Sequence, residues 1–470
     1  MVDTPSPSAA SRSAMRRVLA PLALAQFICS FAGSNMNVMI NDISEDLDTT
    51  VHGVQVSITL FLLVMAALMI PGGKLSDKYG RKRCFLVGLV IYGVGAVLSA
   101  LAPGLWVLIL GNSILEGVGT ALLIPPVYIL TTMLFADLGS RARAFGVISA
   151  LGGIGAAAGP LIGGLITSAV SWRAAFAFQA LIIVIIVLLG RKIDDPLPAD
   201  PGRSFDTRGA VLSAVGLVLV VLGILATDDN VWLMLVLVVL GALVLVGFFL
   251  TARAKERAGG EPLLSPSLFR NRISNLGMVT QNAQWLLLSG ISFVVSAYLQ
   301  VVRGYGAIET GGIFTATTLG LMTASLAAER LVQHVAQRNL ILAGFTVTTA
   351  GIVVLLAMVS DESGVWSFVP GLLIIGLGLG AMLTPSVNIV QSAFPETQQG
   401  EISGLSRSVS NLGSSLGTAV AGTILVANIT TTPQRSYALA LVVLAVIGLA
   451  GLVAAAFLPN DKPRQASHRH

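Results

Sequence analysis

Residues 73–83 read Gly73-Lys74-Leu75-Ser76-Asp77-Lys78-Tyr79-Gly80-Arg81-Lys82-Arg83, and this stretch decides the fold of the chain. It places five cations and one acid directly after an apolar run that is long enough to cross a bilayer. A second apolar run begins at Cys84. A short and strongly basic stretch between two such runs predicts a cytoplasmic turn between two membrane helices.

The rest of the chain is equally apolar. Of its 470 residues, 54% are hydrophobic and 11% are charged, and the mean hydropathy is +0.85. This composition excludes a soluble globular protein and predicts an all-α polytopic membrane protein, because runs of about 20 apolar residues span the hydrocarbon core. The expected 14 spans cover residues 18–40, 52–73, 84–102, 105–127, 144–170, 174–190, 209–226, 231–251, 273–300, 308–328, 339–359, 364–390, 402–427 and 435–458.

Lysine and arginine are distributed unevenly over the connecting segments. With the N-terminus inside, 24 of the 28 fall in inside segments, 3 fall outside and one, Arg407, falls within a span. Cations in short loops stay on the cytoplasmic side, so we expect a multi-pass protein of the inner or plasma membrane with both termini cytoplasmic. The net charge of +5 then reflects topology and contact with membrane lipids, and it gives no reason to expect a nucleic-acid partner.

Residues that build metal, redox or nucleotide sites are sparse. Cys29 and Cys84 fall at different depths of the membrane, and the 4 histidines are scattered, so neither a disulfide nor a metal site is expected. The sequence contains no nucleotide-binding loop. We therefore expect no cofactor, no use of ATP and no enzymatic activity.

The sequence contains an internal repeat. A shift of 258 residues aligns 155–164 with 413–422, and a shift of 259 residues aligns 117–126 with 376–385, in both cases with glycines in register. Spans one to six therefore correspond to spans nine to fourteen, around an inserted pair. The predicted organisation is a disordered cytoplasmic tail, a six-helix bundle, a linker, an inserted helix pair, a linker, a six-helix bundle and a tail, at residues 1–17, 18–190, 191–208, 209–251, 252–272, 273–458 and 459–470.

A second motif lies in the fifth span, at Gly155, Gly159, Pro160, Gly163 and Gly164. Glycines four residues apart allow two helices to approach closely, and a proline removes a backbone hydrogen bond and bends its helix. Such a face can close and open a cavity between helices. Ordinary tight packing of a lipid-embedded helix is the alternative.

Both motifs together resemble the fourteen-helix drug:proton antiporter branch of the major facilitator superfamily, over nearly the whole chain. The loop motif of that superfamily is matched at Gly73, Leu75, Asp77, Gly80, Arg81 and Lys82, and the motif of its exporters at the glycines and proline of span five. The resemblance implies a major facilitator fold with two six-helix bundles plus two inserted helices. It also implies an amphiphilic small-molecule substrate, the proton as coupling ion and a monomeric state.

The resemblance further implies that these two motifs control the gates. Asp77 is expected to face a helix N-terminus or a cation such as Arg81, Arg141 or Arg143, and to hold the cytoplasmic side shut in one state. Gly73, Gly80 and Arg81 belong to the same latch. Lys78, Lys82 and Arg83 are expected only to fix the topology.

Two positions depart from the family pattern. Many relatives carry an acid late in the first helix, where this chain has none, and the usual arginine of span four is replaced by Ser113. What remains is Glu116, the only acid in the central third of any span. A charge there costs on the order of 3 kcal/mol, so the residue is expected to face a cavity or to bind and release a proton. The alternative is a packing acid hydrogen-bonded to a neighbouring span.

Other polar residues are candidates for contact with a substrate. Arg407 is the only embedded cation and can pair with a backbone carbonyl, with Glu401 or with an anionic part of a substrate. Polar side chains within lipid each need a partner or water, so they serve either the substrate or helix packing. The preferred substrate-binding residues are Asn35, Asn37, Gln281, Gln284 and Arg407.

The sequence thus predicts a proton-coupled exporter that moves amphiphilic drugs or other small molecules by alternating access. Glu116 would exchange a proton for the substrate between the two bundles. A dedicated exporter of one endogenous metabolite or lipid would carry the same motifs. A receptor or assembly protein that kept the fold without transport is a further alternative.

Overall fold

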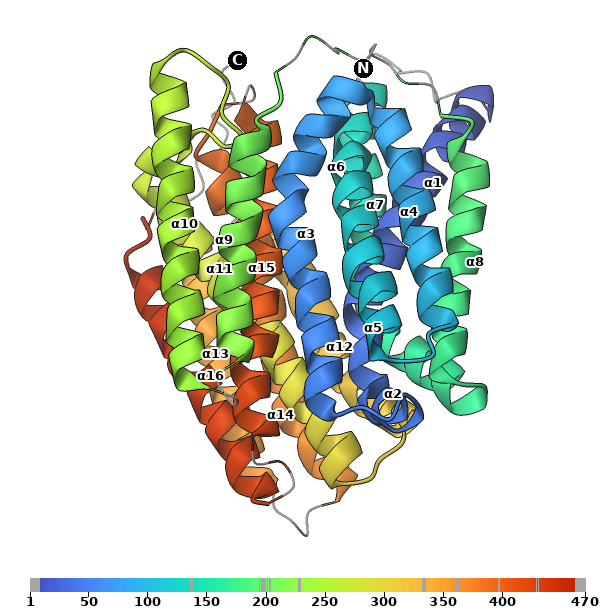
Figure 1. The fold of residues 1–470 in the computed structure, drawn as a ribbon, viewed down its shortest axis with the longest axis vertical. Coiled ribbons are helices and arrows are strands. Elements are labelled where there is room, and N and C mark those ends of the chain that lie inside the picture. The colour runs from blue at the N-terminus through green and yellow to red at the C-terminus, as the bar shows by residue number, and fades with distance from the viewer. Residues whose placement is uncertain are drawn as a thin grey trace, which may run out of the picture.

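The computed structural model of the chain describes residues 9–135, 138–193, 195, 200, 202, 204–226, 230–331, 335–359, 364–395, 398–427, 429 and 431–460. Helices form nearly all of this part, and no strand occurs in it (Figure 1). The first half contains α1 (Ala9–Asn35), η1 (Met36–Met39), α2 (Ile40–Asp46), α3 (Val51–Tyr79), α4 (Arg81–Ala100), α5 (Leu105–Leu108), η2 (Ile109–Glu116), α6 (Gly117–Leu134), α7 (Leu138–Ala169) and α8 (Trp172–Gly190).

The inserted pair and the second half follow in the same pattern. The inserted helices are α9 (Thr207–Leu225) and α10 (Val231–Arg257). The second half contains η3 (Pro266–Arg270), α11 (Arg272–Ala297), η4 (Tyr298–Val302), α12 (Ala307–Leu331), α13 (Gln337–Met358), η5 (Val365–Ser367), α14 (Phe368–Ser392), α15 (Gln399–Val426) and α16 (Pro433–Ala456).

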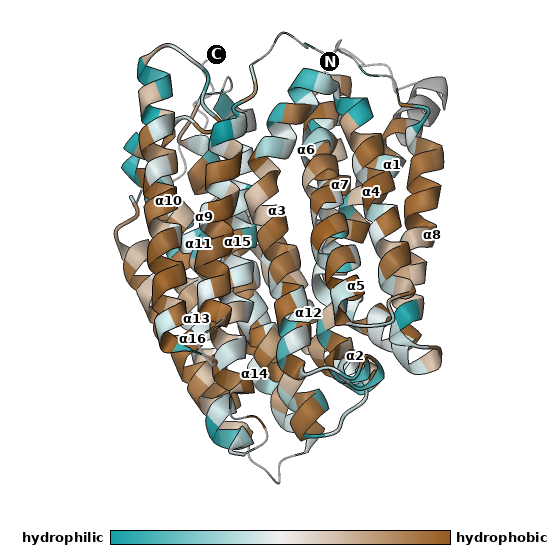
Figure 2. Cartoon of the chain, viewed as in Figure 1, coloured by the Kyte–Doolittle hydropathy of each residue, from teal (hydrophilic) through white to brown (hydrophobic). Residues whose placement is uncertain are grey.

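The helices have the length and polarity of membrane spans. Within the described residues, 13 are long and apolar enough to cross a membrane, and the bent helix α7 brings the number to as many as 14. Apolar residues form a band around the middle of the molecule, and polar residues gather at its two ends (Figure 2). The expected all-α polytopic fold is confirmed.

The start of α1 differs from the sequence prediction. Residues 1–17 were expected to form a disordered tail, but α1 begins at Ala9. Alanine, methionine and arginine favour helix, and residues 9–17 are rich in them, so the helix continues beyond the apolar run. Residues 1–8 and 461–470, which belong to the two predicted tails, lie outside the described residues.

The bend in α7 lies within one turn before Pro160. The axes of Arg143–Ala156 and Ala158–Ala169 meet at 44°. A proline ring clashes with the carbonyl group four residues earlier, and for Pro160 that residue is Ala156. The predicted proline bend is therefore present in the fifth span.

The internal repeat reappears in the packing of the helices. A Cβ atom placed on Gly155 of α7 would lie 2.3 Å from the carbonyl oxygen of Phe27 in α1. A Cβ atom on Gly413 of α15 would lie 2.4 Å from that of Asn282 in α11. Only glycine permits such close backbone contact, so α7 with α1 and α15 with α11 are equivalent pairs. The pairs α4 with α6 and α13 with α14 correspond in the same way.

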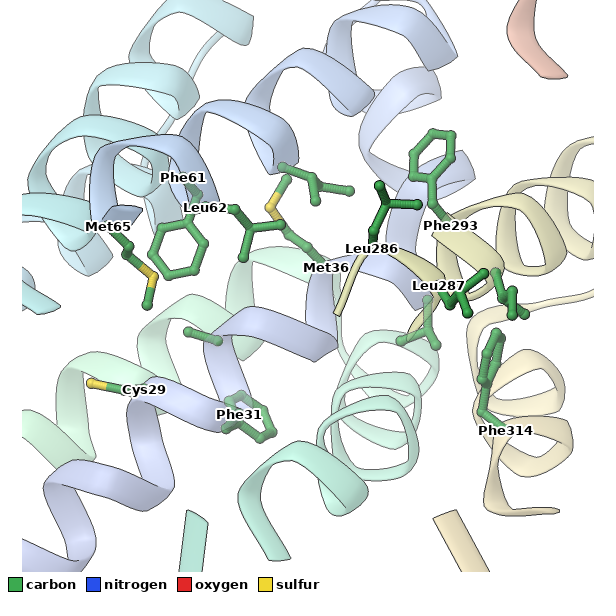
Figure 3. Packing of buried hydrophobic residues seen from close by; sticks show 14 of the residues in the cluster. Cys29, Phe31, Met36, Phe61, Leu62, Met65, Leu286, Leu287, Phe293 and Phe314 are labelled. Atoms are coloured by element: carbon green, nitrogen blue, oxygen red, sulfur yellow. The ribbon is translucent and has the colours of Figure 1, made fainter. Parts of the chain in front are cut away.

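One apolar cluster joins the two halves. It contains side chains of α1 and α3 from the first half and of α11 and α12 from the second half. Figure 3 shows part of it, with Phe31, Met36 and Leu62 on one side and Leu286 and Phe293 on the other. In this region the halves therefore pack against each other largely through apolar side chains.

The inserted helix α9 covers the contact between α3 and α15. Val221 and Leu225 of α9 share a buried cluster with Leu63 of α3 and Ala419 of α15. The linker after α10 is fixed by Asp206, which precedes α9. Burial acts to raise the pKa of Asp206, but the N–H groups of Leu263 and Gly209 and the Lys255 ammonium hold it below its usual value.

We expect Asp206→Asn to lower the thermal stability of the purified protein by about 1–2 kcal/mol, because a charged acceptor becomes neutral. A group with a lowered pKa stabilises the fold above its unfolded value and loses this effect as the pH falls. The difference in melting temperature between the native protein and the variant should therefore be largest at neutral pH. It should shrink below a pH of about 4. A difference that does not depend on pH would show that the charge of Asp206 contributes nothing.

Candidate functional site

Two pairs of helices connect the halves, and the first is α7 with α12. The end of α7 and the start of α12 touch through small residues: a Cβ atom on Gly164 would lie 2.4 Å from the carbonyl oxygen of Ala307, and one on Gly311 would lie 2.3 Å from that of Pro160. The N–H of Ile308 donates a hydrogen bond of 3.1 Å to Ser168 Oγ. We call this contact the α7–α12 seam. Gly164 and Pro160 of the span-five motif therefore lie at the boundary between the halves.

The second pair is α3 with α15, which we call the α3–α15 seam. It carries polar contacts along its length. These are hydrogen bonds from Gln55 Nε2 to the carbonyl oxygens of Thr418 and Ala419 (3.1 and 3.2 Å), from Ser415 Oγ to that of Thr59 (3.1 Å) and from Ser408 Oγ to that of Ala66 (2.5 Å), and an approach of 4.0 Å between Lys74 Nζ and Glu401 Oε1.

The halves are also hydrogen-bonded where η1 and α2 meet the end of α11 and η4. The carbonyl oxygen of Asn37 accepts bonds from Gln300 Nε2, at 2.7 Å, and from the hydroxyl of Ser296. The N–H of Asn41 donates to Gln300 Oε1 at 3.2 Å. Asn37 thus lies between the halves as expected, but it acts there through its main chain. Gln300 and Ser296 were not predicted from the sequence, because their polarity alone did not distinguish them.

Three of the expected substrate-binding residues pack within one half instead. Gln281 bonds to Ser406 and Ser410 of α15, at 2.9 and 2.8 Å. Gln284 lies 3.5 Å from a carbonyl oxygen of α14. Asn35 is buried against Gly163 of α7. The bonds of Gln281 and Gln284 favour the alternative role, helix packing, for these two side chains, whereas the buried amide of Asn35 has no hydrogen-bond partner among the described residues.

Arg407 reaches across the boundary. Its guanidinium donates to the hydroxyl of Tyr128 in α6 and lies over the Tyr128 ring, 4.2 Å from the centroid. Tyr128 in turn donates to Gln26 Oε1 of α1 at 3.1 Å, and Gln26 Nε2 donates to Ser30 at 3.2 Å. We call Arg407, Tyr128 and Gln26 the cross-bundle triad. Tyr128 was missed from the sequence, because one tyrosine in an apolar span has no distinguishing pattern.

Glu116 lies inside the first half. It ends the π-helical segment η2, is fully buried and lies beside α4, where Ser99 Oγ donates to Oε1 at 3.4 Å. The hydroxyl group of Tyr92 lies beside the same carboxyl group. Tyr92 and Gln179, which are hydrogen-bonded to each other, are further buried polar groups of this half. Glu116 is thus enclosed between helices and does not line the boundary between the halves.

The basic turn contains the expected ion pair. Arg81 Nη2 at the start of α4 lies 2.9 Å from Asp77 Oδ1 near the end of α3. Gly80, between α3 and α4, has φ of 95°, a conformation that side chains disfavour. A Cβ atom on Gly73 would only touch Pro125, at 3.7 Å, so Gly73 is not required by close packing here. Lys74 of this turn contacts the other half, because its Nζ lies 4.0 Å from Glu401 Oε1.

The remaining glycines of span five face α1. A Cβ atom on Gly159 would lie 2.0 Å from Ser34 Oγ, and one on Gly163 would lie 3.0 Å from Asn35 Cβ. Gly155, Gly159 and Gly163 therefore hold α7 against α1, and Gly164 holds it against the other half. No group of side chains in the described part of the chain has the composition of a metal site.

Comparisons with known proteins agree with this two-halved arrangement. Residues 22–418 and 277–470 match the family model of the Major Facilitator Superfamily. The chain is 31% identical to the puromycin resistance protein pur8 of Streptomyces alboniger, over 85% of this chain and 80% of that protein. It is 30% identical to the probable actinorhodin transporter of Streptomyces coelicolor, over 83% of this chain and 69% of that protein.

A solved structure shows the same fold. A peptide transporter POT in complex with sulfate superimposes with a TM-score of 0.67 over 94% of both chains, at 17% identity. This likeness concerns the fold alone. Together with the family model and the relatives, it shows that the chain belongs to the major facilitator superfamily, among transporters that export drugs and antibiotics.

Proposed function

We propose that this transporter exports amphiphilic small molecules in exchange for protons. The observation that carries the proposal is Glu116, a fully buried carboxyl group in the middle of a span, beside the hydroxyl groups of Ser99 and Tyr92. An ionisable group in that position is costly unless it has a function, and a carboxyl group that binds and releases a proton suits exchange. The apolar side chains where the halves meet suit cargo with a large hydrocarbon surface.

Alternating access supplies the transport step. The two halves would rock about a central site, and the α7–α12 and α3–α15 seams would separate at one end and close at the other. Glu116 lies away from both seams, so we expect its protonation to act through α6. This helix begins after Glu116 and carries Tyr128 about 18 Å further along. We further expect a monomer in the inner or plasma membrane with both termini cytoplasmic, no resident cofactor and no enzymatic activity.

The test uses purified protein in vesicles with an acidic lumen, because an exchanger of protons for cargo accumulates cargo on the acidic side. The readout is uptake of fluorescent amphiphiles with and without the pH difference. Accumulation that collapses with the pH difference supports the proposal. Uptake that only equilibrates, regardless of pH, would contradict proton coupling, and no uptake at all would favour a non-transporting protein.

A dedicated exporter of one metabolite is the second candidate. Both relatives carry the name of a single compound, puromycin in one case and actinorhodin in the other. The two candidates differ in breadth only. Competition among unrelated amphiphiles for the same uptake would favour the broad exporter, and uptake limited to one chemical family would favour the dedicated one.

The basic turn leads to a separate prediction. We expect Asp77→Asn to leave folding intact and to abolish turnover, because the ion pair with Arg81 that fixes the turn is lost. The size-exclusion profile checks folding, and the rate of cargo uptake checks turnover. Glu261→Gln, an exposed acid of the linker, is the control for loss of one negative charge. Normal uptake by Asp77→Asn would show that the latch is not needed.

A further inference from the structure

We propose that the cross-bundle triad of Arg407, Tyr128 and Gln26 is a cargo subsite that selects aromatic molecules with an acidic group and disfavours lipophilic cations. This inference rests on the proposed export function and names the class of its cargo. The subsite combines a cation, an aromatic ring and an amide, three groups that bind an acidic aromatic molecule by different interactions.

The position of the triad fits a site between the halves. Arg407 belongs to α15 of the second half, Tyr128 and Gln26 to α6 and α1 of the first. Arg407 and Tyr128 are partly exposed, whereas Gln26 is 8% exposed. The groups are therefore within reach of a small molecule, and they are still held in place by one another.

Two glycines near the triad leave room for further atoms. A Cβ atom on Gly33, two turns after Gln26 in α1, would meet no atom within 4 Å. The same holds for Gly404, about one turn before Arg407 in α15. Glycines in membrane helices usually mark close packing, as at Gly155. At these two positions the absence of a side chain leaves room instead, beside the polar groups.

The charge of the triad is not balanced by the protein. Within the described residues, no carboxylate lies within 4.0 Å of Arg407, whose polar partner is the neutral Tyr128 hydroxyl. Glu401, the acid one to two turns away, accepts bonds of 2.8 and 3.3 Å from Ser265. A guanidinium in low dielectric is stabilised by an anion, and a carboxylate or phenolate of the cargo can supply it.

The aromatic part of the cargo has a partner in the same place. The ring of Tyr128 stacks on Phe145 of α7, with centroids 6.0 Å apart. In the absence of cargo the guanidinium covers the Tyr128 ring. An acidic aromatic molecule can bind Arg407 with its anion and take the ring face that Arg407 leaves. A cationic cargo is repelled by the charge of Arg407 instead. Glu116, a mid-span acid that could attract it, is enclosed within the first half.

Displacement of Arg407 would also couple cargo to movement. The contact between Arg407 and Tyr128 joins the two halves, so cargo that breaks it removes one restraint on their separation. The cargo then favours the conformation in which the halves have moved, as population shift requires.

The experiment compares two dyes with the same xanthene ring system in vesicles of the native protein. Fluorescein is anionic and tetramethylrhodamine methyl ester is cationic. We expect fluorescein uptake to exceed that of the rhodamine by about tenfold, the ratio that one charge-assisted hydrogen bond supports. Arg407→Gln should remove this preference, mainly through a higher KM for fluorescein, and Arg407→Lys should restore part of it.

Controls separate the subsite from export itself. Arg253→Gln removes one exposed cation of α10 and should leave the preference unchanged. Native protein that prefers the rhodamine, or a preference that survives in Arg407→Gln, would overturn the subsite and leave export standing. Uptake of neither dye by correctly folded native protein would overturn the proposed export function and the subsite together.

Discussion

Vesicles that contain Glu116→Gln are expected to lose accumulation of cargo against its gradient, while downhill movement of cargo persists. One pH unit corresponds to about 1.4 kcal/mol, so exchange of one proton per cargo molecule sustains a concentration ratio of about tenfold. Glutamine keeps the size and the hydrogen-bonding groups of the side chain but cannot exchange a proton. The ratio should therefore fall to about one, which is measured as the steady-state dye ratio across the membrane.

The control is Glu309→Gln, which makes the same chemical change at an exposed position at the start of α12. Its accumulation ratio should equal that of the native protein. A native ratio in the Glu116→Gln variant would move proton coupling to another group and leave Glu116 as a packing acid. If the Glu116→Gln variant does not fold, size exclusion before reconstitution shows it, so misfolding is not mistaken for either transport result.

Gly164→Leu is expected to stop the transport cycle by holding the α7–α12 seam apart. Its Cβ atom would lie 2.4 Å from the carbonyl oxygen of Ala307, which belongs to the backbone of the other half and cannot rotate away. Overpacking of this kind costs about 1–3 kcal/mol, which reduces the population with this seam closed by about 5- to 150-fold. We expect the rate of cargo uptake to fall by the same factor.

Two glycines of the same helix separate gating from folding. A Cβ atom on Gly153 would meet nothing within 4 Å, so Gly153→Leu should transport normally. Gly155→Leu would clash with the backbone of Phe27 in the same half, so it should lower the yield of folded protein. If Gly164→Leu instead behaves like Gly155→Leu, its glycine serves packing rather than the gate. Normal transport by Gly164→Leu would exclude both roles.

The fold was predictable because its signals repeat. Apolar runs and the glycine repeat each extend over many residues, and together they specified the helices and the correspondence between the two halves. The start of α1 at Ala9 was not predicted, since helix propensity outside the apolar run is a weak signal. The bend of α7 was predictable, because the effect of Pro160 is local and steric.

The site was harder to predict because the polarity of a residue does not reveal which way its side chain points. Gln281 and Arg407 were equal candidates in the sequence, yet Gln281 is bonded between α11 and α15 and Arg407 crosses to α6. Which way a side chain points depends on how two helices 100 residues or more apart are rotated against each other. Tyr128 shows the same limit, since its contact with Arg407 spans 279 residues of sequence.

The unequal bonding of the two seams has a mechanical consequence. Hydrogen bonds and one cation–carboxylate approach run along the α3–α15 seam, and α9 covers it from outside. The α7–α12 seam is held where α7 ends and α12 begins, by glycine–carbonyl contacts and the bond from Ile308 to Ser168. The halves of such a body should swing rather than slide, with the stiffer side acting as a hinge and the weaker side travelling further. A lopsided motion of this kind would widen one flank of the molecule towards the surrounding lipid in every cycle.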